Sequence, residues 1–162
     1  MDDIVVVTGA SGYIGSHIVS NLLSKGRNVR ATVRDCRDPS RVEHLLNIPI
    51  NEGGSLEIVE MDLLDYKSVE SAIYGVTDVI HTAAVVMIKS DSPQIDIVDP
   101  SIVGTRNVLN AIEKSGTVKN LIHTSSTAAI RPAKWKNGAI LNSTMFANDA
   151  TLTTNPYGFA KY

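Results

Sequence analysis

The last residues of the chain combine a phenol and an ammonium at a spacing that suits proton transfer. Tyr157 and Lys161 stand four residues apart, so in a helix they share one face. A free tyrosine titrates at about pH 10, which is too high for efficient proton transfer at neutral pH, and a neighbouring ammonium favours the phenolate. Such a pair can give a proton to a carbonyl oxygen while hydride arrives at the carbon. The pair alone is weak evidence, because most such pairs are surface accidents.

A glycine-rich turn lies at the opposite end of the chain, between the apolar run 4–7 and a helical pattern. Glycine there permits a sharp turn and lets the backbone approach a pyrophosphate, which the amides at the N-terminus of the helix can bind. The third glycine lets the helix pack closely on the strand. An ordinary strand-to-helix turn is the alternative, but the position favours dinucleotide binding. The candidate residues of the turn are Gly9, Gly12, Tyr13, Ile14 and Gly15.

The second predicted strand, 28–34, ends in Arg34 and is followed by Asp35. In a dinucleotide fold an acid at this place commonly binds the ribose 2′-hydroxyl of NAD, whereas a basic residue accommodates the 2′-phosphate of NADP. The guanidinium of Arg34 suits a phosphate because it offers several donors, and Asp35 is the competing candidate that favours NAD. A solvated strand end is the further alternative for Arg34.

The elements that would position these residues alternate between strand and helix. Short apolar stretches predict strands at 4–7, 28–34, 56–59, 78–82 and 121–124. Helical spacing follows in the stretches 14–23, 39–46, 69–73 and 102–112, and a short helix is expected from Pro156. This pattern predicts an α/β fold with a doubly wound parallel sheet of Rossmann type, in one domain over residues 1–162. Between 129 and 155 the periodicity fails, which predicts a long loop.

Composition limits the partners of the chain. The net charge is −2, with acids and bases mixed, which argues against nucleic acid as a partner. No run approaches the roughly 20 apolar residues of a membrane span, and the single cysteine, Cys36, suits a reducing compartment, so a soluble cytoplasmic protein is expected. Cys36 is expected to be an inert loop thiol. The four histidines form no metal-like pair, so no metal site is expected; they are His17, His44, His81 and His123.

Several motifs occur in a fixed order along the chain. The pattern T-G-x-x-G-x-x-G at 8–15 is followed by Ala-Thr-Val-Arg-Asp at 31–35, Val-Glu-His-Leu-Leu at 42–46, Met-Asp-Leu at 61–63 and His-Thr-Ala-Ala at 81–84. With these motifs the chain resembles the extended branch of the short-chain dehydrogenase/reductase superfamily, near the dihydroflavonol reductase and cinnamoyl-CoA reductase group. The resemblance covers essentially the whole chain. It implies an NADP(H)-dependent oxidoreductase acting on a carbonyl or alcohol of a small molecule.

The resemblance also implies catalytic roles. Ser126, the last residue of a Thr-Ser-Ser triplet, would hydrogen-bond the substrate oxygen, and Tyr157 would supply its proton. Tyr157 and Lys161 would also bind the cofactor, with Lys161 holding the nicotinamide ribose. Two residues depart from the family pattern. Ala160 stands where the family often has serine, and Ser101 stands where some relatives have an asparagine of a proton relay.

On the cofactor side, the resemblance implies that Arg34 selects NADP. The Asp62 carboxylate and the Leu63 backbone would meet the adenine edge, although Asp62 is also a candidate helix N-cap. The small residues Ala83 and Ala84 would let the cofactor ribose approach the backbone.

In the group that this chain resembles, the chains extend for roughly as many residues again beyond the part that matches. A fragment without its substrate portion is therefore expected. It should bind NADP(H) weakly and turn over slowly or not at all. Two other functions stay open. One is a sugar-nucleotide epimerase or dehydratase that recycles bound NAD, and the other is a non-catalytic dinucleotide-binding module. A homodimer is expected only by analogy with such families.

Overall fold

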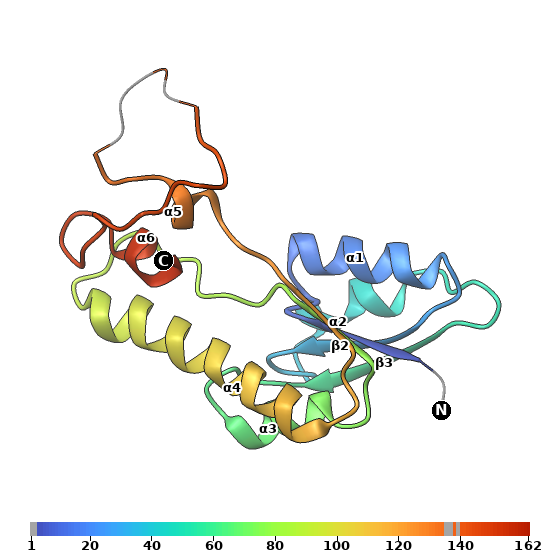
Figure 1. The fold of residues 1–162 in the computed structure, drawn as a ribbon. Coiled ribbons are helices and arrows are strands. Elements are labelled where there is room, and N and C mark those ends of the chain that lie inside the picture. Colours follow the sequence, from blue (N-terminus) through green and yellow to red (C-terminus); the bar gives the residue numbers. More distant parts are fainter. Residues whose placement is uncertain (1–2, 135–137, 139) are drawn as a thin grey trace. The chain divides into compact units, whose positions relative to one another are not determined.

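A computed structural model describes residues 3–134, 138 and 140–162 of the chain, which form two compact units (Figure 1). The first unit comprises residues 1–83 and 105–124, and the second comprises residues 84–104 and 125–162. Helix α4, Asp99–Ser115, contributes to both units.

The first unit is built on a five-stranded, all-parallel sheet with the strand order β3-β2-β1-β4-β5. The strands are β1 Ile4–Thr8, β2 Asn28–Val33, β3 Ser55–Glu60, β4 Asp78–His81 and β5 Asn120–His123. Because all the strands run the same way, their carboxyl ends share one edge, where Thr8 is in register with His81. The predicted doubly wound parallel sheet is confirmed.

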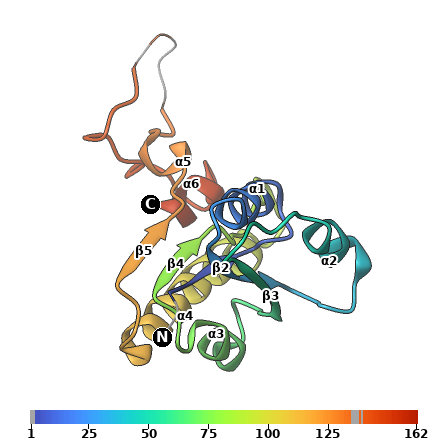
Figure 2. The same cartoon turned by 90° about the vertical axis from the view of Figure 1, so that its right-hand side faces the viewer.

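Helices cover both faces of this sheet. Helices α1 (Tyr13–Leu23) and α2 (Pro39–Leu46) lie on one face, while α3 (Tyr66–Ile73) and the C-terminal part of α4 lie on the other (Figures 1 and 2). Val7 packs into the core below α1 and α2, whereas its neighbour Val6 packs into the core beside α3 and α4. A strand that is buried on both faces needs apolar residues at consecutive positions, which explains the uninterrupted run in β1.

Strand β5 differs from the other strands because its side chains are not buried under helices. All four of its residues are exposed, and Ile122 keeps 60% of its accessible surface. It lies at the edge of the sheet and pairs with β4.

Aspartates begin two of the helices. The Asp38 side chain accepts a hydrogen bond from the Ser40 amide at 3.0 Å, and Pro39 stands in the first turn of α2. The Asp65 side chain accepts one from the Lys67 amide at 3.0 Å at the start of α3. Such caps satisfy amides that have no partner inside the helix.

The second unit contains a π-helical turn η1 (Gln94–Val98), the N-terminal part of α4 and the short helices α5 (Thr127–Ile130) and α6 (Pro156–Lys161). Helix α6 contacts both η1 and α5. Helix α5 takes up the first residues of the predicted loop, and no described residue between 131 and 155 lies in a helix or strand. The Asp149 carboxylate ties this loop together by accepting hydrogen bonds from the amides of Ala133 and Lys134 at 2.6 and 3.0 Å.

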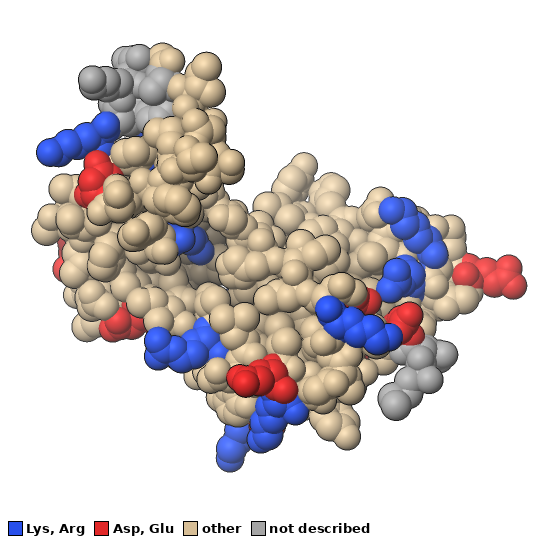
Figure 3. Space-filling model, in the orientation of Figure 1, with Lys and Arg blue, Asp and Glu red and all other residues tan. Residues whose placement is uncertain are grey.

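Charged side chains are interspersed with neutral ones on the face drawn in Figure 3. Among the described residues, no helix has the length and apolar character that crossing a bilayer requires. The absence of a nucleic-acid partner stays a prediction.

Candidate functional site

The glycine turn between β1 and α1 depends on residues without side chains. Gly9 has a φ of +66°, which favours glycine, and a Cβ there would lie 2.9 Å from the Cα of Ala83. A Cβ on Gly15 would lie 2.8 Å from the Cα of Ala10 and would overlap the Gly9 carbonyl oxygen. Helix α1 therefore packs closely on the glycine turn at Gly15, while the predicted close packing of this helix on the strand at Gly15 stays a prediction.

The N-terminus of α1 presents unused amides. Gly12 is the N-cap, with an extended backbone and no side chain bonded to the first turn. Within the described ranges, no acceptor bonds the amides of Tyr13, Ile14 and Gly15. A Cβ on Gly12 would have only the Gly9 carbonyl oxygen, at 3.3 Å, within 4 Å. The open side of Gly12 and the free amides suit a diphosphate, and the contact with a cofactor stays a prediction.

The hydroxyl of Thr8 joins the ends of β1 and β4. It accepts hydrogen bonds from the amides of Thr82 and Ala83 at 3.1 and 3.0 Å, and it lies 2.7 Å from Nδ1 of His81. A hydroxyl has one proton and two lone pairs. Because the two amides engage both lone pairs, the hydroxyl donates its hydrogen bond to His81 Nδ1. Sequence reasoning missed this role of Thr8. The available signal was a threonine at a buried strand end directly before the first glycine of the turn.

The carboxyl end of β2 holds the residues that bear on cofactor choice. Arg34 is exposed, and no described residue forms a hydrogen bond or ion pair with its side chain. Asp35 instead pairs with Arg37, whose Nε lies 3.1 Å from Asp35 Oδ1. This contact lowers the pKa of the Asp35 carboxyl, first through the side-chain hydrogen bond and then through the Arg37 amide. Arg37 was also missed from sequence, where only Arg34 and Asp35 were weighed.

Asp62 and Leu63 follow β3. The alternative that Asp62 caps a helix is wrong, because α3 begins four residues later, at Tyr66, and Asp65 is its N-cap. Asp62 Oδ1 accepts a hydrogen bond from the Leu64 amide at 2.9 Å, and the Leu63 carbonyl accepts one from Asn107 Nδ2 at 2.7 Å. These bonds fix the turn after β3, while the predicted contact of Asp62 with adenine stays a prediction.

The second unit carries the catalytic candidates. Tyr157 and Lys161 share one face of α6, with the Lys161 ammonium 5.3 Å from the centre of the Tyr157 ring, and burial lowers the pKa of Lys161. The Ser126 hydroxyl accepts a hydrogen bond from the Ala128 amide at 3.1 Å and so caps α5. The structure thus brings Tyr157 and Lys161 together, and no hydrogen bond joins Ser126 to Tyr157 among the described residues.

Two further features of the second unit bear on the site. The Ser101 hydroxyl donates to the Ile97 carbonyl at 2.6 Å, so in this structure it is engaged with its own helical segment. An open pocket of about 580 Å³ is lined by residues 88–91 and 152–156. None of the three catalytic candidates lines this pocket, and Ala84, at the start of the unit, does not line it either.

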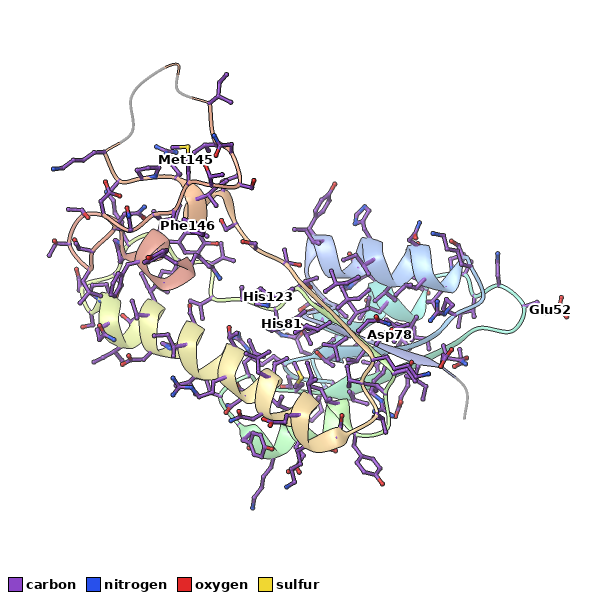
Figure 4. The ribbon with its side chains drawn as sticks, viewed as in Figure 1. Glu52, Asp78, His81, His123, Met145 and Phe146 are labelled. Carbon is purple, nitrogen blue, oxygen red and sulfur yellow. The ribbon has the colours of Figure 1, made fainter. Side chains whose placement is uncertain are left out.

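His81 and His123 lie side by side at the ends of β4 and β5, with ring centres 5.1 Å apart (Figure 4). His81 is buried and bonded to Thr8, while His123 is exposed. In the part of the chain that the structure describes, no three metal-binding side chains come together. Burial, with Glu60 as the second cause, raises the pKa of the Cys36 thiol, as suits an unreactive cysteine.

The sequence also matches a known family. The model of the 3-beta hydroxysteroid dehydrogenase/isomerase family matches residues 6–158. The chain belongs to this family. The matched span includes the glycine turn, the end of β2 and Tyr157, and the predicted membership of the extended short-chain dehydrogenase/reductase superfamily is confirmed.

Similar members of the family are plant reductases. The chain is 40% identical to a cinnamoyl-CoA reductase of Medicago truncatula over 132 residues, which are 80% of this chain and 40% of that protein. It is 41% identical to a bifunctional dihydroflavonol 4-reductase/flavanone 4-reductase of Malus domestica over 126 residues, which are 78% of this chain and 36% of that protein. The chain thus spans well under half the length of these relatives.

A solved structure shares this fold over about half of its own length. The yeast methylglyoxal/isovaleraldehyde reductase Gre2, complexed with NADPH, superposes with a TM-score of 0.78 at 26% identity. The match covers 98% of this chain and 49% of the yeast chain.

Replacing Gly15 with alanine is expected to lower the free energy of unfolding by about 1–3 kcal/mol, because the new Cβ overlaps backbone atoms of the turn. Gly12→Ala is the matched control. Gly12 has a φ of −80°, so its alanine variant should stay within about 1 kcal/mol of the original chain. Urea unfolding of both variants measures the difference, and equal stabilities would contradict the close packing described for Gly15.

Proposed function

We propose that this chain is the NADP(H)-binding part of an oxidoreductase that reduces a ketone or aldehyde of a small molecule. The family and its reductase members support the reaction class. The NADPH complex of the yeast reductase supports the cofactor. The observation that carries the proposal is at the end of β2, where Arg34 is exposed and unpaired among the described residues while Asp35 is held by Arg37.

The chain's own residues suit this cofactor. The free amides at the start of α1 would hold the diphosphate, and the Arg34 guanidinium would bind the 2′-phosphate through charge-assisted hydrogen bonds. Asp62 and the Leu63 backbone would border the adenine, while Ala83 and Ala84 would leave room for a ribose. The cofactor would supply the hydride.

The catalytic step would use the second unit. The Tyr157 hydroxyl would donate its proton to the substrate oxygen, and the Ser126 hydroxyl would hydrogen-bond the same oxygen. Lys161 would hold the nicotinamide ribose and place its positive charge beside Tyr157, whose ring it already contacts. We also propose a soluble, cytoplasmic protein in which residues 1–162 act as one cofactor-binding domain.

The proposal is tested by titrating the chain with NADPH and NADH. We expect NADPH to bind more tightly, and Arg34→Ala to weaken NADPH binding about tenfold while leaving NADH binding unchanged, because the guanidinium contacts only the extra phosphate. Arg106→Ala, on helix α4 away from β2, is the matched control. A chain that binds neither dinucleotide would overturn the proposal, and a preference for NADH would favour an enzyme that recycles NAD.

A further inference from the structure

The acid that follows Arg34 is occupied by an arginine of the same loop. Resting on the proposed function, we infer that Arg37 is a specificity-determining residue. By pairing with Asp35, it occupies the carboxylate and compensates its charge. Without Arg37 this carboxylate would bind the ribose 2′-hydroxyl of NAD(H) and repel the 2′-phosphate of NADP(H).

The contacts between Asp35 and Arg37 use most of the carboxylate. Asp35 Oδ1 accepts hydrogen bonds from the Arg37 amide at 2.8 Å and from Arg37 Nε at 3.1 Å, and Oδ2 lies 3.5 Å from Arg37 Nη2. A carboxylate has about four lone-pair sites, so about three of them face a single arginine. A ribose hydroxyl that donated to Asp35 would have to displace these bonds.

The other aspartate of the loop is also occupied. Asp38 Oδ1 accepts hydrogen bonds from the amide and the hydroxyl of Ser40 at 3.0 and 2.6 Å, and Oδ2 accepts one from Arg41 Nε at 3.0 Å. Both aspartates between residues 34 and 41 are therefore paired with an arginine. Arg34 keeps its positive charge free for a phosphate.

The third acid near this loop is Glu60, at the end of β3. Its Oε2 accepts a hydrogen bond from the Cys36 amide at 3.4 Å. The hydrogen bond and then the charge of Asp35 raise the pKa of Arg37, and the charge of Glu60 is the next cause. Removing the Arg37 charge would leave Asp35 and Glu60 less compensated, because of the two arginine charges that act on Asp35 only that of Arg41 would remain. Both would then oppose the entry of a doubly charged phosphate.

Arg37 contributes little to the fold. Its side chain is 86% exposed and that of Asp35 is 39% exposed, and solvent-screened ion pairs in such positions contribute little to stability. A variant at position 37 should therefore fold normally. A change in cofactor preference would then report the electrostatics of the site rather than a loss of structure.

The test is to titrate the original chain, Arg37→Ala and the double variant Asp35→Asn/Arg37→Ala with NADPH and NADH. We expect Arg37→Ala to lower the ratio of NADPH affinity to NADH affinity about tenfold, from the electrostatic effect of one uncompensated charge. The double variant should recover most of the ratio, because it removes the carboxylate that Arg37 covers. Arg27→Ala is the matched control, since Arg27 pairs with Asp78 and lies before β2; it should leave the ratio unchanged.

The outcomes separate this inference from the proposed function. If the original chain binds neither dinucleotide, the proposed function fails and the inference fails with it. If the original chain prefers NADPH but Arg37→Ala keeps the same ratio, only the inference fails. An equal fall in the single and double variants also overturns it, because Arg37 would then contact the phosphate itself rather than act through Asp35.

Discussion

Replacing Thr8 with valine is expected to lower the free energy of unfolding by about 3–5 kcal/mol. Valine keeps the shape and strand preference of threonine but has no hydroxyl. The amides of Thr82 and Ala83 and the Nδ1 atom of His81 would each lose a hydrogen bond. Thr8 and His81 are almost completely buried, so water cannot easily replace these bonds, and each unsatisfied group costs about 1–3 kcal/mol.

Thr8→Ser is the control for this prediction, because it keeps the hydroxyl and loses only a methyl group. Urea unfolding should place the serine variant much closer to the original chain than the valine variant. Hydrogen exchange adds a local measurement: in Thr8→Val the amides of Thr82 and Ala83 should exchange faster. A valine variant as stable as the serine variant would show that this hydroxyl does not hold β1 to β4.

Most of the fold could be predicted because its signals are local. A strand buried on both faces needs a continuous apolar run, and the helices that follow show their own spacing. The glycine turn was predicted for the same reason, since a φ of +66° at Gly9 and the lack of room at Gly15 demand glycine at those positions.

The parts that were missed depend on contacts between distant residues or on competition between neighbouring ones. Thr8 bonds to His81 across 73 positions of sequence, which the spacing along one element cannot indicate. Only Asp62 was considered as a cap from sequence, whereas the hydrogen bond of the Lys67 amide shows that Asp65 caps α3. Arg37 was missed because the pairing of Asp35 depends on how the loop turns back on itself.

The catalytic candidates were predicted with less structural support. The spacing of Tyr157 and Lys161 was sufficient to predict a shared helix face, and in the structure the Lys161 ammonium lies 5.3 Å from the centre of the Tyr157 ring. Ser126 was assigned by resemblance, and in the structure its hydroxyl also caps α5. A hydroxyl that accepts a hydrogen bond at a helix start still has its own proton to donate, so the cap and the proposed catalytic role of Ser126 are compatible.

Slow turnover or none is expected of this chain, and where its hydride transfer from NADPH to a small aldehyde or ketone is measurable, replacing Tyr157 with phenylalanine is expected to slow it further by about 10²- to 10⁴-fold, the usual contribution of a positioned proton donor. NADPH affinity should not change, because the ring that Lys161 contacts is retained. The measurement is a single-turnover assay with the protein in excess over NADPH. Tyr162→Phe is the matched control, since Tyr162 ends the same helix, is 63% exposed and packs on Phe146.

The two readouts of this experiment distinguish chemistry from structure. Loss of transfer with unchanged NADPH affinity assigns the proton to the Tyr157 hydroxyl. Parallel loss of both would mean that Tyr157 supports the binding site, and an unchanged rate would mean that another group donates the proton.

Lys161 adds a dependence on pH with a defined sign. Because burial lowers the pKa of Lys161, its ammonium loses its proton at a lower pH than an exposed lysine does, so transfer that depends on this charge should decline earlier on the alkaline side.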